Sequence, residues 1–507
     1  MKTFLLSLLF AAMAAGQTVQ GDIVNAATGA PLAGAHIIAN VANGKPLIVK
    51  ADAGGHFQLS AGTGPMFFLL IGYPGFLPAS RGFQQSQAGA DLRIALTPAA
   101  VIAGTIQDED GFPVYQAQVE AVRYRLQHGR RVLSPAASTQ SDDLGHYRLA
   151  NLPAGRYWVR VSAFRLANWD RRYAPQYFPG GLQPDGTNRI EVQAGQERSV
   201  DIRMTKHDGV TIAGRVEMPS GAVVSTGPNW VELLTDRPGG QETTSSVPTS
   251  GGSFVIRHVP AGSYILRARA AGNYPPTTGD LVGEQKLEVG DADEPNVVVA
   301  MHQVQPVDVA GTVVMDDGSK PPPLYVTARS MMGPGVTAQT AEDGSFALKG
   351  LLWGHYELAT IPSRLVDGKV VDGSPAYTIS ARLGEQEVLE TGFDVEASSP
   401  GPLRITMSNR HIALTGSLTD DFGKPAADVT LAFVLNGAWT ENVGNTDGHG
   451  VIHASVRQAG DYHIYVVPDQ SSIDDEDYVE QHANDFPIIH LVDGANAPLV
   501  LRMPATQ

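Results

Sequence analysis

Residues 141–161 read SDDLGHYRLANLPAGRYWVRV, a stretch in which two glycine-marked turns flank an alternating strand. Closely similar phrases return as TSGGSFVIRHVPAGSYILRA at residues 249–268 and as AEDGSFALKGLLWGHYELAT at residues 341–360. A phrase that recurs at near-regular intervals is typical of a structural unit that is used several times. We therefore expect the repeated residues to build the fold rather than to form a functional site.

A second element of the repeat is a short apolar strand that carries a small residue followed by glycine. It reads VIAGTI, TIAGRV, DVAGTV and ALTGSL, with VQGDIV from residue 19 as a looser first copy. The four clear copies place their glycines at Gly104, Gly214, Gly311 and Gly416, which are 110, 97 and 105 residues apart. Each spacing suits one small β-sandwich domain.

The recurring phrase itself predicts two strands and a buried tyrosine. Its first turn glycine is followed two residues later by an aromatic residue in four copies, whereas the fifth copy, aligned on Gly448, has Gly450 there. A second turn introduces Tyr157, Tyr264, Tyr356 and Tyr462, after which apolar residues alternate. This pattern predicts a β-hairpin whose tyrosine ring is buried and whose hydroxyl is bonded to nearby backbone.

The composition favours an all-β fold. Glycine (55) and proline (34) are abundant and leave no room for long amphipathic helices. About seven strands per hundred residues predict a tandem array of five Greek-key, Ig-like β-sandwiches. The expected domains are a signal peptide at 1–16 and sandwiches at 17–98, 99–206, 207–303, 304–407 and 408–507.

The N-terminus predicts export. The stretch MKTFLLSLLFAAMAAGQ combines a lysine, an apolar run and small residues at a cleavage site, as in a secretory signal peptide. The chain has no cysteine, which excludes disulfides and a bacterial lipoprotein anchor, and its net charge of −16 disfavours nucleic acid as a partner. We therefore expect a periplasmic or extracellular protein without a transmembrane segment.

The combined motifs A-G-x-V, D-x-x-G-x-P, D-x-x-G-x-[FY]-x-[LI] and P-A-G-x-Y resemble the carboxypeptidase regulatory-like domain. The resemblance covers nearly all of the mature chain and implies a transthyretin- or prealbumin-like sandwich, related to starch-binding and Cna-B-type modules. The stretch YAPQYFPGG with IEVQAGQE is also similar to large secreted proteins of acidobacteria. Members of the family are accessory modules, some of them described as carbohydrate-binding, so the resemblance implies little about activity.

Catalytic motifs are absent from the sequence. HExxH, G-x-S-x-G, the phosphate-binding G-x-x-x-x-G-K-[ST] and G-x-G-x-x-G do not occur. We expect no enzyme activity and no cofactor, with an enzyme of unrecognised type, or an accessory protein of a secreted hydrolase, as the alternative. With nine lysines in the chain and none on the opening strands after the glycine, isopeptide cross-links are not expected either.

Histidine is concentrated in the last repeat, which holds six of the fourteen. Strand alternation predicts that His453 and His463 lie on the outer face of one hairpin, where Asp461 would complete a divalent metal site. The alternative is a solvated sheet face whose polar residues bind nothing.

The aromatic insertion at residues 164–181 is the second candidate site. It reads FRLANWDRRYAPQYFPGG and combines Trp169, Tyr173 and Tyr177 with Arg171 and Arg172. Open ring faces beside guanidinium groups suit a sugar or a protein hot spot. The alternative is that the segment covers the end of its own sandwich.

Together these features predict an exported, non-catalytic array of β-sandwiches with a binding, spacer or adhesion role. The expected partners are a polysaccharide or another protein of the cell envelope. A carbohydrate-binding protein that uses the aromatic insertion is the alternative function.

Overall fold

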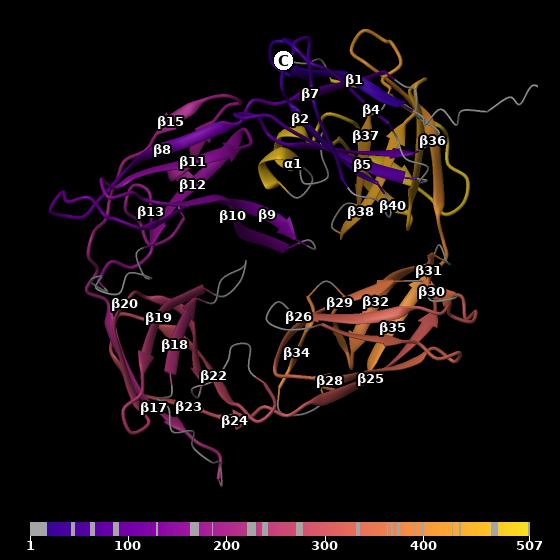
Figure 1. Ribbon diagram of the computed structural model, residues 1–507. Helices are drawn as coiled ribbons and strands as arrows, with labels where there is room; N and C mark the ends of the chain where they lie inside the picture. Colours follow the sequence, from indigo (N-terminus) through magenta and orange to yellow (C-terminus); the bar gives the residue numbers. More distant parts are fainter. Residues whose placement is uncertain are drawn as a thin grey trace, which may run out of the picture. The chain divides into compact units, whose positions relative to one another are not determined.

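The computed structural model is built almost entirely of β-strands (Figure 1). It describes residues 18–41, 46–60, 66–84, 91–127, 130–162, 172–184, 186–220, 230–235, 242–269, 277–330, 335–361, 363–366, 369–372, 376–389, 391–396, 400–427, 429–435, 438–467 and 475–504. The expected signal peptide and the centre of the aromatic insertion lie outside these residues. Among the described residues, no helix has the length and apolar composition of a membrane span.

The chain divides into two compact units, and each is described by itself. Unit 1 comprises residues 1–122, 135–161 and 177–203, and unit 2 comprises residues 123–134, 162–176 and 204–507. The strands follow the repeats of the sequence, and each of the first four repeats contains two separate main sheets. The all-β, tandem-sandwich fold class is thereby confirmed.

The first two repeats share one plan. In the first, the sheets have the strand orders β4-β1-β7 and β3-β2-β5-β6. Its strands are β1 (Thr18–Asn25), β2 (His36–Val41), β3 (Leu47–Lys50), β4 (His56–Ser60), β5 (Met66–Gly72), β6 (Ala79–Gln84) and β7 (Asp91–Leu96). In the second, the orders are β11-β8-β15, with β16 beside β8, and β10-β9-β12-β13, with β14 beside β12. Its strands are β8 (Ala100–Gln107), β9 (Gln118–Gln127), β10 (Arg130–Gln140), β11 (His146–Leu152), β12 (Gly155–Ser162), β13 (Gln176–Tyr177), β14 (Ile190–Val192), β15 (Glu197–Ser199) and β16 (Ile202–Arg203).

The third and fourth repeats keep the plan and extend their sheets. The third has the orders β20-β17-β23 and β19-β18-β21-β22-β24. Its strands are β17 (Val210–Glu217), β18 (Trp230–Thr235), β19 (Glu242–Pro248), β20 (Ser253–Val259), β21 (Gly262–Arg269), β22 (Leu281–Val289), β23 (Glu294–Ala300) and β24 (His302–Gln303). The fourth has the orders β28-β25-β35-β32-β33 and β27-β26-β29-β34. Its strands are β25 (Val307–Met315), β26 (Tyr325–Ser330), β27 (Val336–Gln339), β28 (Ser345–Leu351), β29 (Gly354–Ile361), β32 (Tyr377–Leu383), β33 (Gln386–Glu387), β34 (Phe393–Val395) and β35 (Leu403–Ser408).

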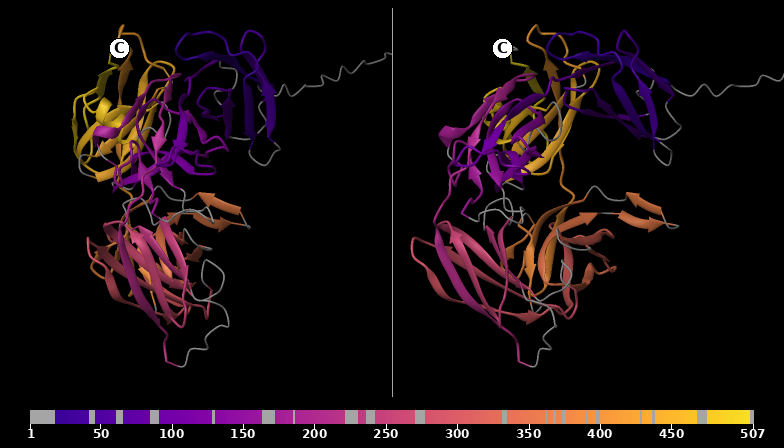
Figure 2. Two further views of the ribbon diagram at one scale, coloured as in Figure 1. Left: turned by 90° about the vertical axis from the view of Figure 1, so that its left-hand side faces the viewer. Right: turned by 60° about the vertical axis from the view of Figure 1, so that its left-hand side comes forward.

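A two-stranded hairpin is added to the fourth repeat. It consists of β30 (Ser363–Val366) and β31 (Lys369–Asp372), which pair only with each other among the described strands. Figure 2 shows it as an orange hairpin that extends away from the sandwich of this repeat.

The fifth repeat joins its strands into one sheet of seven, in the order β41-β40-β37-β38-β39-β36-β42. The strands are β36 (Ile412–Thr419), β37 (Thr430–Leu435), β38 (Ala438–Thr446), β39 (Val451–Val456), β40 (Gly460–Val466), β41 (Ile489–Leu491) and β42 (Leu499–Arg502), and the helix α1 (Glu476–His482) follows β40. The long strand β38 makes the sheet continuous because its last two residues pair with β39, Asn445 with His453 and Thr446 with Ile452.

In every repeat the first strand pairs in parallel with the last. The pairs are β1 with β7, β8 with β15 and β16, β17 with β23, β25 with β35, and β36 with β42. The glycine of the opening motif lies at this junction. A Cβ added at Gly104 would lie only 1.9 Å from the carbonyl oxygen of Val200, and the corresponding glycines are equally confined. The small-residue motif therefore exists because the closing strand lies against the backbone of the opening strand.

The aromatic residue of the recurring phrase covers this glycine from the neighbouring strand. Gly311 stands opposite Phe346 in the antiparallel register, and a Cβ at Gly311 would lie 2.3 Å from the Phe346 ring. In the second repeat Tyr147 stands opposite Gly104 and donates its hydroxyl to the carbonyl oxygen of Val200 at 2.6 Å. An aromatic ring laid over a strand glycine restores the apolar contact that the glycine lacks.

The two strands of the recurring phrase do not form the predicted hairpin. β11 pairs with β8, whereas β12 belongs to the sheet of β9, and the same separation holds for β20 and β21 and for β28 and β29. In the fifth repeat β39 and β40 lie in one sheet but are not neighbours, because β39 pairs with β36 and β40 with β37. The connecting turn therefore carries the chain from one side of the sandwich to the other. Alternation alone cannot distinguish a hairpin from such a crossing, because both place one face of each strand in the core.

The tyrosine after this crossing is buried, as predicted, and its hydroxyl returns to the turn. Tyr157 donates to the carbonyl oxygen of Pro153, four residues back, at 2.8 Å. The same bond to the residue four positions earlier recurs at Tyr264, Tyr356 and Tyr462, with lengths of 3.0, 3.1 and 2.8 Å. The arrangement is a tyrosine corner that fixes the crossing at four places along the chain.

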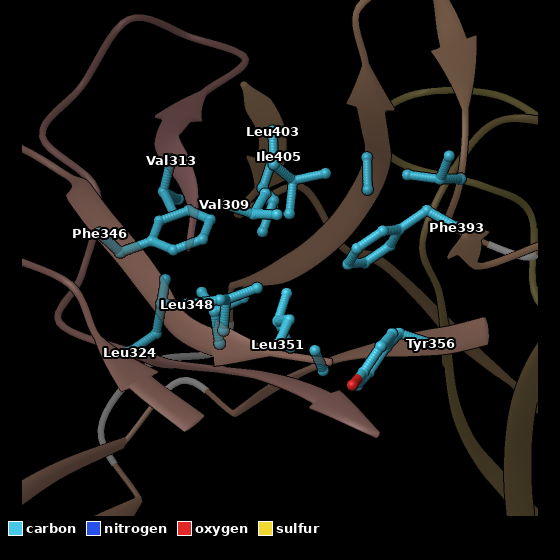
Figure 3. Close-up of a cluster of buried hydrophobic side chains, with 14 of the residues drawn as sticks. Val309, Val313, Leu324, Phe346, Leu348, Leu351, Tyr356, Phe393, Leu403 and Ile405 are labelled. Atoms are coloured by element: carbon cyan, nitrogen blue, oxygen red, sulfur yellow. The ribbon is translucent and has the colours of Figure 1, made fainter. Parts of the chain in front are cut away.

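The core of the fourth repeat shows how these features combine (Figure 3). Aliphatic side chains from both sheets meet between them, with Phe346 at one end of the cluster and Tyr356 at the other. Tyr356 stacks on Phe393 of β34 with ring centroids 5.9 Å apart. The two aromatic positions of the sequence motif thus pack at opposite ends of one core.

The fifth copy of the phrase aligns differently from the sequence-based expectation. Gly450, at φ 72°, has the left-handed conformation that the other four turn glycines have, and its Cβ position would face the carbonyl oxygen of Leu418 at 2.6 Å. The alignment on Gly448 was therefore wrong by two residues. Ile452, opposite Gly416, takes the place of the aromatic residue.

We expect Gly104→Ala to destabilise the second repeat by at least about 2 kcal/mol, because the new methyl group would overlap the carbonyl oxygen of Val200. Denaturant unfolding of the full chain would measure the loss. Gly186→Ala is the control, since no heavy atom lies within 4 Å of its Cβ position. Equal stability of the two variants would contradict the role assigned to the glycine.

We expect Tyr157→Phe to cost about 1–2 kcal/mol of unfolding free energy, because the ring stays in the core while the Pro153 carbonyl loses its donor. Thermal and denaturant unfolding would measure the change. Tyr115→Phe, at an exposed tyrosine of the same repeat, serves as the matched control and should change stability little.

Candidate binding surfaces

The aromatic insertion is only partly described by the structure. Trp169 and Arg171 lie outside the described residues. Tyr173 and Tyr177 are 7% and 2% exposed, so neither ring offers the open face that sugar stacking needs. The expectation of solvent-open rings is therefore corrected for these two tyrosines. The partly buried Arg172 uses its backbone carbonyl to accept a hydrogen bond from the amide of His207 at 2.8 Å.

In unit 1, the segment after Tyr177 continues beside β12, the strand with which β13 pairs. The amide of Phe178 donates to the carbonyl oxygen of Val159 at 2.8 Å. The guanidinium of Arg189 lies 4.5 Å from the centroid of the Trp158 ring, which is itself buried. Because its backbone extends the pairing of β13 with β12, this part of the insertion belongs to the edge of its own sheet.

In unit 2, residues 172–176 are held by the segment between β16 and β17, which begins at Met204. The side chain of the buried Gln176 donates through Nε2 to the carbonyl oxygen of Thr205 at 2.6 Å, and its Oε1 accepts from the backbone N–H of Thr205 at 3.0 Å. The ammonium of Lys206 lies 5.3 Å from the centroid of the Tyr173 ring. These contacts explain why Tyr173 is buried despite its position in an insertion.

The three residues of the predicted metal site are not brought together. His453 lies on β39 and His463 on β40, and the strands β37 and β38 separate these two in the sheet. His453 faces Asp447 at 3.3 Å, whereas Asp461 is bonded to His490 at 2.7 Å. Among the residues that the structure describes, no group of three His, Asp or Glu side chains could hold a metal ion. The hairpin on which the site was predicted is the crossing between the two sides of the sandwich.

The Asp461–His490 pair instead belongs to a position that recurs in the fold. The residue after the second turn glycine faces a polar residue on the neighbouring strand in four repeats: Arg156 faces Glu191, Ser263 faces Glu288, His355 faces Asp394, and Asp461 faces His490. The hydrogen bond with Asp394 raises the pKa of His355, and the same bond lowers the pKa of Asp394. A cross-strand polar pair accounts for these side chains without a ligand.

The carboxylates of the turn aspartates also accept hydrogen bonds from backbone amides within the same turn. Asp142 Oδ1 accepts from the amides of Leu144 and His146 at 3.0 and 2.7 Å, and Asp447 makes the same pair of bonds two and four residues ahead. The amide of Val451 contributes most to lowering the pKa of the Asp447 carboxyl. The sequence-based assignment of these aspartates to turn formation agrees with this geometry.

Two groups of unit 2 were not singled out in the sequence. The first is Trp353, in the second turn of the fourth repeat. The guanidinium of Arg267 lies 5.6 Å from the centroid of its ring, and the centroid of the His302 ring lies 6.4 Å from the same point. Arg123 forms a buried ion pair with Asp475, the N-cap of α1. No sequence signal marks either group, because each joins residues that are distant along the chain.

Comparison with known proteins identifies the second repeat. Residues 101–205 match the family model of the carboxypeptidase regulatory-like domain. No curated protein matches the chain. Among solved structures, the Bacillus anthracis TIE protein is 16% identical, with 74% of this chain and 66% of that chain covered and a TM-score of 0.17. A streptococcal ancillary pilin is 12% identical, with coverages of 62% and 99% and a TM-score of 0.19.

The Bacillus cereus major pilin subunit BcpA is 11% identical, with coverages of 61% and 99% and a TM-score of 0.15. At such TM-scores these likenesses carry no inference about function. The family match, in contrast, falls on the strands and turns described above. The resemblance read from the sequence is confirmed by this match, in which residues 101–205 are similar to the carboxypeptidase regulatory-like domain.

Proposed function

We propose that this protein is an exported, non-catalytic array of β-sandwich domains that binds, spaces or adheres at the cell exterior. The observation that supports it is the use of the repeated polar residues inside the fold. The tyrosine hydroxyls bond the carbonyl four residues back, and the turn aspartates bond their own amides. Residues repeated in this way build a scaffold, and recognition is left to surfaces that differ between repeats.

The domain organisation forms part of this proposal. Five sandwiches, at residues 17–98, 99–206, 207–303, 304–407 and 408–507, would present their outer faces and loops in series. Loops carried on a rigid sandwich are a common place for recognition. An array of this kind needs no cofactor, and its partner would be a polysaccharide or another protein of the cell envelope.

The export part of the proposal predicts a mature chain that begins near Gln17. Mass spectrometry of the N-terminal peptide, together with protease accessibility on intact and permeabilised cells, would measure it. Cleaved chain that is accessible outside the cytoplasmic membrane is the expected result. Exported material that still carries Met1, or turnover of a substrate by the purified chain, would contradict the proposal.

Sugar binding by the insertion at residues 164–181 is a second proposal, motivated by Trp169 beside Arg171 and Arg172 in the sequence. With Tyr173 and Tyr177 buried, Trp169 would supply the stacking face.

We expect Trp169→Ala to weaken binding of any glycan retained on a glycan array by about 1–3 kcal/mol without loss of the fold. Phe422→Ala, at an exposed aromatic residue of the fifth repeat, is the control. A marked loss of thermal stability in Trp169→Ala, with no glycan retained by the native chain, would identify the segment as a packing element.

A further inference from the structure

One end of the second repeat exposes three apolar side chains. Phe112 is 67% exposed, Leu144 63% and Tyr115 53%. Residues 108–116 and 142–146, which carry them, are here called the tip surface. Aromatic and aliphatic side chains in such positions are the kind that anchor protein–protein interfaces.

The two turns of the tip surface adjoin each other. The amide of Ile106 donates to the carbonyl oxygen of Gly145 at 2.8 Å, and the amide of Gln116 donates to that of Ser141 at 3.0 Å. A Cβ at Gly145 would lie 3.2 Å from the Cβ of Pro113. The backbones are therefore in contact, and the three exposed side chains share one end of the sandwich.

Both turns are held rigid by aspartate side chains. Asp108 Oδ1 accepts from the amides of Asp110 and Phe112 at 3.0 and 2.9 Å. Asp142 Oδ1 does the same for Leu144 at 3.0 Å. Because the backbone of Phe112 and Leu144 is already ordered, a partner would lose less conformational entropy on binding them.

The other repeats show that the fold does not need apolar residues here. Four repeats can be aligned at this end by the proline that packs against the turn glycine, which is Pro31, Pro113, Pro321 or Pro425. The residue before this proline is Ala30, Phe112, Lys320 or Lys424, and the residue before the turn glycine is Gly54, Leu144, Asp343 or His449. At these two positions the first, fourth and fifth repeats have small or polar residues, although the same turn of the fifth repeat carries an exposed aromatic residue, Phe422, two positions before Lys424. Among these four repeats, the second alone has apolar residues at both positions.

The tip surface is acidic around its apolar side chains. Residues 108–116 and 142–146 include five carboxylates and no lysine or arginine. Glu109, Asp110 and Asp143 are exposed, and Arg203 lies beside this turn, with its Nη2 3.6 Å from the position of a Cβ at Gly111. An apolar centre with an acidic rim is complementary to apolar side chains flanked by positive charge.

We propose that the tip surface is the docking site for a partner protein segment that presents aromatic or aliphatic side chains between lysine or arginine residues. This inference rests on the proposed function and names the chemistry of the partner. The apolar side chains would cover Phe112, Leu144 and Tyr115, while the basic residues would face Asp110 and Asp143. The segment is a protein rather than a sugar, because the rim offers carboxylates to pair with cations.

Panning a random-peptide display library on the immobilised full chain would test this, followed by fluorescence polarisation of the enriched peptides. We expect enriched peptides to be cationic and to lose at least about tenfold in affinity on Phe112→Ser and Leu144→Ser. Raising the salt concentration from about 0.05 to about 0.5 M should weaken binding, as should Asp110→Asn with Asp143→Asn. Phe422→Ser, at an 83% exposed turn residue of the fifth repeat, is the matched control and should leave affinity unchanged.

Peptides that bind the serine variants as well as the native chain would overturn the proposal, and so would enriched peptides without positive charge. A glycan retained through Phe112, or a self-association that Phe112→Ser abolishes, would also overturn it by assigning the surface to a different occupant. Thermal unfolding of each variant separates lost docking from lost folding. These outcomes leave the export and non-catalytic parts of the proposed function untouched, since those are decided by the N-terminus and by assays for turnover.

Discussion

The closest approach between two backbones governs this fold. In each repeat the last strand returns to lie in parallel beside the first, and at the second repeat a Cβ on Gly104 would be 1.9 Å from the carbonyl oxygen of Val200. Only glycine permits that approach. The aromatic residue opposite, or Ile452 in the fifth repeat, then fills the space left beside the missing side chain. The parallel pairing of the first and last strands therefore accounts for three features together. These are the closure of the sheet, the spacing of the glycines and the position of the aromatic residue.

The tyrosine corner is the second constraint, and it acts on connectivity. The chain has to leave one side of the sandwich and enter the other within a few residues. A hydroxyl that bonds the carbonyl four residues back holds this turn while its ring enters the core. Since the hydroxyl satisfies a backbone acceptor that is partly buried, the same residue contributes both packing and hydrogen bonding.

Most of the residues that repeat take part in one of these two constraints. They are therefore explained by the fold and need no role in function. Residues 101–205, which match the model of the carboxypeptidase regulatory-like domain, include one copy of the residues that close the sheet and fix the crossing. What differs between repeats is at the surface: the insertion of the second repeat, the hairpin β30–β31 of the fourth, the helix α1 of the fifth, and the apolar tip surface. A scaffold of this kind can acquire partners one repeat at a time, because turn residues change without disturbing the core.

The sequence by itself determined the repeat, the all-β class, the buried tyrosines and the turn role of the aspartates. Those features depend on neighbours within a few residues or on a period that is visible along the chain. Tertiary structure decided which strands pair, and so it replaced the expected hairpin with a crossing between the sides of the sandwich and separated His453 from His463. It also buried Tyr173 and Tyr177, because the contact of Tyr173 with Lys206 and the pairing of β13 with β12 join segments that no local pattern connects. Pairing and burial are relations between distant residues, and alternation within one strand carries no information about its partner.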